Sequence, residues 1–145
     1  MKWVTRARPK TDRIACPWLI RRFIDPEAEF LFVPKDDVLA AADRENATSF
    51  DAAGARYTHR GNQCTFEVLV EDHGLADKDP ALGEMARIVH AADIEAEEST
   101  HPFGAAISAI GTAGLDVESD DHRLLERGMF VYDALYAWCL RNAHA

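Results

Sequence analysis

The sequence has few cysteines and lacks the residue spacings of common metal and catalytic motifs. Its three cysteines, Cys16, Cys64 and Cys139, form no C-x-x-C pair, so neither a disulfide framework nor a zinc knuckle is indicated. The six histidines show no H-x-x-x-H or H-E-x-x-H spacing, and neither a glycine-rich phosphate loop nor a G-x-S-x-G motif is present. The residues therefore give no support to most familiar enzyme classes.

Long hydrophobic runs are also missing. No apolar run approaches the ~20 residues that cross a bilayer, and the opening residues MKWVTRAR lack the apolar stretch of a signal peptide. We therefore expect a cytoplasmic protein that does not enter a membrane. A length of 145 residues with 48% hydrophobic and 28% charged residues is typical of one globular domain, so we expect residues 1–145 to form a single domain.

Positive charge is scarce overall but concentrated at one end. The chain has 25 acidic and 16 basic residues, a net charge of -9, which disfavours direct binding to nucleic acid. Residues 1–22 nevertheless contain seven basic residues and only one acidic residue, Asp12. Two interpretations are open: the arginines pair with the acidic remainder of the chain, or their guanidinium groups form a site for a small anion.

The pattern of apolar residues and breakers predicts strands first and helices afterwards. We expect a strand at 2–7, a helix at 12–24, a strand at 29–33, a helix at 36–43 and two short strands at 49–53 and 56–59. Helices alone follow, at 65–73, 79–92, 102–110 and 120–141, with a loop at 93–100. This order predicts an α+β fold: a small β-sheet with a helical layer and a long C-terminal helix.

Several segments resemble the ChrB-type chromate resistance family. The similar segments are WVTRARP at 3–9, DRIACPWLIRRFI at 12–24, HRG at 59–61, CTF at 64–66 and YDALYAW at 132–138. The resemblance is to the C-terminal domain of those proteins and covers nearly the whole chain. It implies a link to chromate resistance and to chromate-dependent regulation of an efflux operon. The N-terminal segment of the longer members is not matched, so we expect no DNA binding that depends on it.

The basic N-terminal segment is the first candidate site. Alternation along a strand places Arg6 and Arg8 on the same face. Pro17 favours the first position of a helix, which would place Cys16 at the helix cap, where the dipole stabilises an anion or a thiolate and lowers the thiol pKa. The alternative for Cys16 is a small buried side chain. An oxyanion such as chromate would suit a site formed by Arg6, Arg8, Arg13, Arg21, Arg22 and Cys16.

The long last helix carries the second candidate site. His122, Glu126 and Asp133 fall on one helical stripe, and Asp133 lies among apolar residues, so it needs a partner if it is buried. That partner is either a metal ion or an arginine such as Arg13. Histidine and carboxylate ligands suit zinc, iron or manganese. The complete predicted ligand set is His122, Glu126, Asp133, His59 and Glu67.

These observations predict a chromate-response domain that binds an oxyanion or a divalent metal ion, as a sensor or an accessory module. A metal-dependent or thiol-dependent enzyme, such as a chromate reductase, is one alternative. A partner-binding module that uses the acidic surface is the other, and a homo-oligomer is compatible with the sequence.

Overall fold

A small parallel sheet forms the N-terminal part of the computed structural model, which describes residues 1–143. β1 (Lys2–Arg6) lies between β2 (Glu29–Val33) and β3 (Thr48–Ser49). β1 pairs in parallel with both neighbours, and its register places Lys2 opposite Glu29 and Trp3 opposite Thr48. A central parallel strand is covered on both faces, which explains why its middle residues are all buried.

Helices cover both faces of this sheet. α1 (Asp12–Leu19) connects β1 to β2, continues as π-helical turns over Ile20–Ile24, and is buried along its whole length. α2 (Val38–Glu45) follows the 3-10 turn Lys35–Asp37 and covers the opposite face, where a small apolar cluster includes Val4 of β1.

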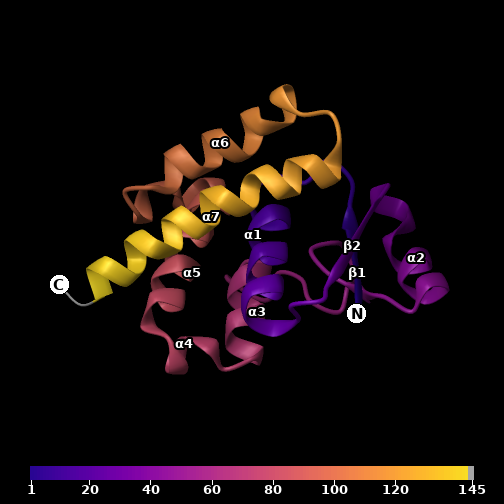
Figure 1. Cartoon of the computed structure of the whole chain (residues 1–145), viewed down its shortest axis with the longest axis horizontal. Helices are drawn as coiled ribbons and strands as arrows, with labels where there is room; N and C mark the ends of the chain where they lie inside the picture. Colours follow the sequence, from indigo (N-terminus) through magenta and orange to yellow (C-terminus); the bar gives the residue numbers. More distant parts are fainter. Residues whose placement is uncertain (144–145) are drawn as a thin grey trace.

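The C-terminal part of the chain is helical. α6 and α7 lie side by side and run in opposite directions, with α1, α3 and α5 beneath them and the sheet and α2 at one end (Figure 1). The main core lies between these layers and includes the fully buried Trp18, Phe66 and Leu125. The helices are α3 (Thr65–Asp72), α4 (Leu75–Lys78), α5 (Pro80–Asp93), α6 (Gly104–Val117) and α7 (Asp121–Ala143).

This architecture confirms the predicted α+β fold with its small sheet, helical layer and long C-terminal helix. The predicted strand pair at 49–53 and 56–59 is wrong, because only Thr48–Ser49 forms a strand and Tyr57 returns through a single bridge to Phe50. The predicted loop at 93–100 contains 3-10 turns over Glu95–Thr100. α4 was not predicted, and α6 continues through the two glycines at which its end was expected.

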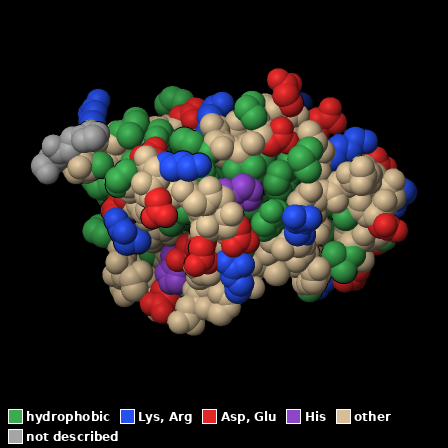
Figure 2. All heavy atoms as spheres, turned by 90° about the horizontal axis from the view of Figure 1, so that it is seen from below, with side chains coloured by type: hydrophobic (Ala, Val, Ile, Leu, Met, Phe, Trp, Pro, Cys, Tyr) green, Lys and Arg blue, Asp and Glu red, His purple; other side chains and the backbone are tan. Residues whose placement is uncertain are grey.

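Charged and apolar side chains are mixed on the surface. Figure 2 shows one face on which acidic, basic and hydrophobic side chains are interspersed. Many of the surface charges form ion pairs, such as Lys2 with Glu45 and Arg60 with Glu71 and Asp72. Within residues 1–143, none of the helices combines the length and the apolar character that a membrane span requires.

Candidate functional site

The five arginines of the predicted anion site lie in three different places. Arg6 and Arg13 meet at Asp51, each with a nitrogen 3.5 Å from its Oδ2 atom. Arg8 instead binds the turn between α6 and α7, where it donates to Asp121 and to backbone carbonyls of residues 115, 118 and 119. These contacts follow the first interpretation, in which arginines pair with the acidic remainder of the chain. Anion binding stays a prediction.

Arg21 and Arg22 face the C-terminal helix. Arg21 donates to Glu126 at 2.8 Å, and Arg22 donates through two nitrogens to the two oxygens of Asp133. The π-helical turns after α1 therefore carry both arginines to α7, away from Arg6 and Arg13.

Cys16 lies inside α1 and not at its cap. The helix begins at Asp12, so Pro17 lies within it and not at its first position. The Cys16 thiol is fully buried and donates to Oδ1 of Asp12 at 3.0 Å. Burial raises its pKa well above the usual range, and the charges of Asp12 and Asp51 act in the same direction. The predicted lowering of the Cys16 pKa is therefore wrong.

The predicted metal ligands His122 and Glu126 of α7 and Glu67 of α3 contact other side chains. The His122 ring packs edge-on against Phe32 with ring centroids 5.2 Å apart, and Glu126 pairs with Arg21. Glu67 accepts the backbone N–H of Cys64 and contacts Nδ1 of His90. Among residues 1–143, the predicted five do not form a group with closely spaced ligand atoms. His59, however, lies in a different group of closely spaced ligand atoms, with Asp12 and Asp93.

Asp133 has the partner that its apolar surroundings predicted, but it is not buried. Its side chain is 44% exposed. It accepts the Trp18 indole N–H at 2.8 Å in addition to the bonds from Arg22. The partner is an arginine, as one alternative held, yet it is Arg22 and not Arg13.

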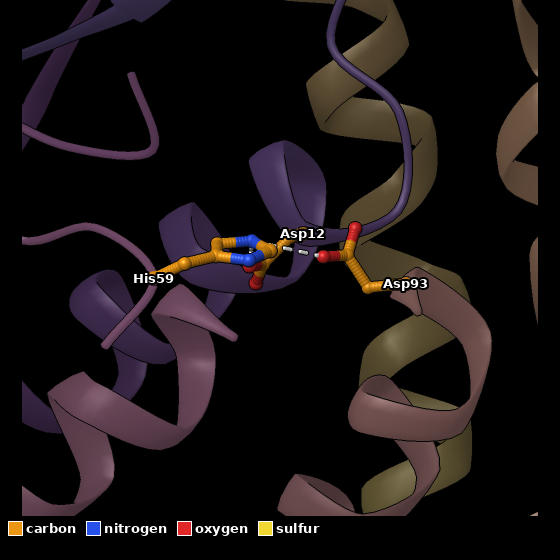
Figure 3. Close-up of side chains that lie close together, drawn as sticks. All are labelled: Asp12, His59 and Asp93. Atoms are coloured by element: carbon orange, nitrogen blue, oxygen red, sulfur yellow. Dashed lines mark ion pairs between the residues drawn. The ribbon is translucent and has the colours of Figure 1, made fainter. Parts of the chain in front are cut away.

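His59 meets three carboxylates at the junction of the sheet and the helical layer. Its Nε2 atom lies 3.2 Å from Asp93, 3.5 Å from Asp51 and 3.8 Å from Asp12. Figure 3 shows His59 on its loop pointing toward Asp12 at the start of α1 and Asp93 at the end of α5. We call Asp12, Asp51, His59 and Asp93 the acid–histidine cluster.

Local hydrogen bonds fix the two most buried carboxylates of this cluster. Asp12 accepts the backbone N–H groups of Thr65 and Phe66 at 2.9 and 3.2 Å, and thereby caps the N-terminus of α3. Asp51 accepts the Thr65 hydroxyl at 2.8 Å and has a left-handed backbone with φ of 48°. Such a conformation costs on the order of 1 kcal/mol outside glycine and is typical of functional sites.

The electrostatics of the cluster favour an added cation. Burial, followed by the charge of Asp51, raises the pKa of both Asp12 and Asp93. A hydrogen bond to Asp51, together with the neighbouring carboxylate charges, raises the pKa of His59 to about 9. Burial opposes ionisation of Asp51, but hydrogen bonds from His59 and Thr65 hold its pKa below the usual range. The imidazolium thus serves as the counter-ion of crowded carboxylates.

The same group has the donor atoms of a metal site. Asp12, His59 and Asp93 each offer one ligand atom, and these atoms all lie within 4.8 Å of one another. Two carboxylate oxygens and an imidazole nitrogen suit zinc, iron or manganese. Asp51 and the arginines beside it would lie next to such an ion without being needed as ligands.

Sequence reasoning found His59 but missed the three carboxylates. Asp93 did carry a signal, because it is the last residue of a helix and directly follows Ala91 and Ala92. A negative charge at a helix C-terminus is disfavoured by the helix dipole, so a carboxylate there suggests a specific partner.

Fold and site together define a small α+β domain with a carboxylate–histidine cluster between its sheet and its helices. Residues 3–139 match the family described as ChrB, C-terminal domain, and the chain belongs to this family. The chain is 37% identical over 135 residues to Protein ChrB of Cupriavidus metallidurans. That match covers 93% of this chain but 40% of the relative, so the chain spans well under half of the relative's length. No solved structure matches the chain.

Proposed function

We propose that this chain is a chromate-response domain that binds a metal ion through Asp12, His59 and Asp93. Membership of the ChrB C-terminal domain family supports the role in chromate resistance or response. One observation carries the metal site: two carboxylates and an imidazole, contributed by α1, α5 and the loop before α3, place their ligand atoms within 4.8 Å of one another.

A cation at this position would replace the proton on His59 as the counter-charge of the cluster. It would also connect α1, the loop and α5, which are far apart in the sequence. Such a connection is what a sensor or accessory module needs, because metal binding is then coupled to the packing of the domain. Zinc, iron(II) and manganese(II) fit the ligand types.

Metal titration of the chelator-treated protein tests the proposal. We expect one equivalent of zinc, iron(II) or manganese(II) to bind, as measured by calorimetry and elemental analysis. Asp93→Asn and His59→Gln should each weaken binding by ~100-fold, because each removes one ligand. His122→Gln is the matched control, since His122 packs against Phe32 outside the cluster. Unchanged binding in both ligand variants would contradict the site.

A second candidate is an oxyanion site on the same cluster. Arg6, Arg13 and His59 converge on Asp51, and the side chains of Arg6 and His59 are 38% and 47% exposed. These cations could receive chromate if Asp51 or a neighbour gives up its contacts. Chromate binding by metal-free protein that is lost in Arg6→Gln and retained in Asp93→Asn would favour this candidate over the metal site.

The thiol-dependent reductase receives less support. Cys16 and Cys64 are both fully buried, and burial raises the pKa of each thiol far above neutral pH. A nucleophilic or reducing thiol acts as the thiolate, which is scarce under these conditions.

A further inference from the structure

α6 exposes apolar residues on sides that would normally be polar. From residue 102 to residue 115 the sequence contains no Asp, Glu, Lys or Arg. A helix that is apolar all round is typical of a buried element. Yet Ile110 is 54% exposed and Val117 is 73% exposed, and Ala113 between them is also exposed. The side of α6 that carries Ile110 and Val117 is therefore left largely uncovered by residues 1–143.

α7 continues this apolar surface. Phe130 is 76% exposed and Trp138 is 38% exposed, and Ala134 lies exposed between them. At ~100° per residue these three positions share one side of α7, as Ile110, Ala113 and Val117 share one side of α6. We call these six residues the α6–α7 face. The two helices lie side by side in Figure 1.

A hollow between the helices gives this face the shape to receive a large side chain. It has a volume of about 330 Å³ and is lined by both helices and by Pro9, Thr11 and Ile14. Ile110 and Val117 form one side of the hollow, and Val131 and Leu124 form the other. Interlocking of large side chains with such hollows is typical of helix–helix interfaces.

We propose that the α6–α7 face binds the same face of a second copy of this chain, which forms a two-fold symmetric dimer with a four-helix contact. This inference does not depend on the metal site. Closed two-fold dimers are the commonest homo-oligomers, and their interfaces pair one patch with itself.

The available area fits a dimer. The four large side chains on the α6–α7 face are between 38% and 76% exposed and have exposed alanines around them, so the face can supply a substantial part of the ~800 Å² that each partner buries in a standard interface. The surrounding side chains supply the remaining area. Aromatic residues such as Phe130 and Trp138 are also the types that contribute most to binding at the centre of an interface.

The charges around the face also fit a second copy. The whole chain has a net charge of -9, which opposes self-association. Around this face, however, Arg123 and Arg127 of α7 lie close to Glu118, so both signs are present. Two copies that meet here avoid the repulsion that their acidic surfaces would cause, and the arginines of one copy can pair with the carboxylates of the other.

Sedimentation equilibrium and light scattering of the full chain test the dimer. We expect a reversible dimer across about 1–200 µM protein. Ile110→Glu and Phe130→Glu should each raise the dimer dissociation constant ~10-fold or more, because each places a charge in the interface. Leu39→Glu is the matched control, since Leu39 is a 50% exposed leucine on α2, away from this face.

Circular dichroism and thermal unfolding establish that each variant is folded. Phe130 is so exposed that its replacement disturbs no core contact, so Phe130→Glu remains informative if Ile110→Glu is unstable. A wild-type chain that is monomeric across the whole range would overturn the proposal. The proposal would also be overturned if Phe130→Glu left the dimer dissociation constant unchanged, or if Leu39→Glu raised it as much as Phe130→Glu does.

Discussion

Asp133 joins the C-terminal helix to α1 through two kinds of donor. Its carboxylate accepts the indole N–H of Trp18, whose ring lies fully buried in the core, and it pairs with the guanidinium of Arg22 at the surface. The hydrogen bond from Arg22 comes first among the causes that lower the pKa of Asp133. The exposed ion pair adds little to stability, whereas Asp133 is the one acceptor of the Trp18 N–H within residues 1–143.

We therefore expect Asp133→Ala to lower the free energy of unfolding by ~1–2 kcal/mol, mainly because the Trp18 N–H loses its acceptor. Asp133→Asn keeps an acceptor and should cost about half as much. Urea titration measures both, with the exposed Glu97→Ala as control, expected within ~0.5 kcal/mol of wild type. The Asp133 contribution should disappear at acid pH, as the pH falls through its lowered pKa. An Asp133→Ala chain as stable as wild type at neutral pH would contradict this account.

The carboxylate partners of His59 in the acid–histidine cluster could not be predicted from the sequence. His59 could be named as a ligand from its residue type, but its partners are set by the packing of α1 against α5. Nothing in local patterning pairs the first residue of one helix with the last residue of another. The resemblance located the segments 12–24 and 59–66 that carry two members of the cluster, although it assigned neither Asp12 nor Asp93 a role.

Among the elements, α6 shows why helix ends are hard to predict. Gly111 and Gly114 suggested a stop, because glycine weakens a helix and often follows its last residue. The helix nevertheless continues to Val117, and of the two glycines only Gly111 lies at a close contact with another segment. A side chain at position 111 would place its Cβ 2.6 Å from Oγ1 of Thr11 and 2.9 Å from its backbone nitrogen. At position 114 the nearest atom would be Cδ1 of Leu124, at an ordinary contact distance of 3.5 Å.

The two glycines make a matched pair. Gly111→Ala should destabilise the protein by ~1–3 kcal/mol, because the added methyl collides with the Thr11 backbone and outweighs the better helix propensity of alanine. Gly114→Ala should be neutral or stabilising by up to ~1 kcal/mol, because it gains propensity without a collision. Thermal and urea unfolding of both variants provide the measurement. Equal effects of the two substitutions would show that α6 does not contact Thr11 as described.

At the scale of the whole molecule, the segregation of charge along the sequence disappears in the fold. The N-terminal arginines of the predicted anion site reach Asp51, Asp121, Glu126 and Asp133, which come from the loop after β3 and from α7. The basic segment therefore serves to join distant acidic parts of the chain. The composition predicted, as one alternative, that these arginines pair with acidic residues. It could not predict that Arg6 and Arg13 would lie beside His59 at Asp51.

The acid–histidine cluster includes Asp12 of α1 and Asp93 of α5, and it also contacts Arg6 of β1 and Thr65 of α3. Its protonation should therefore affect the stability of the whole domain. The pKa of His59 is raised to about 9 in the metal-free protein, above its value of ~6.5 in an unfolded chain. A raised pKa contributes stability that is complete below pH ~6.5 and is lost as the pH rises through about 9. Because the His59 side chain is 47% exposed, solvent screening reduces this contribution to on the order of 1 kcal/mol.

Urea unfolding of the chelator-treated protein between pH 6.5 and 7.5 should therefore show stability that falls as the pH rises, in a range that ends about one unit below the pKa of ~8.5 of unfolded thiols. His59→Gln should remove this dependence, because glutamine does not titrate, whereas His122→Gln, outside the cluster, should retain it. Added zinc should also flatten the curve, since a bound cation replaces the proton as the counter-charge of Asp12 and Asp93. A metal-free wild type whose stability is constant across this range would mean that His59 does not carry the counter-charge of the carboxylates. The electrostatic reason for a cation at the cluster would then be lost.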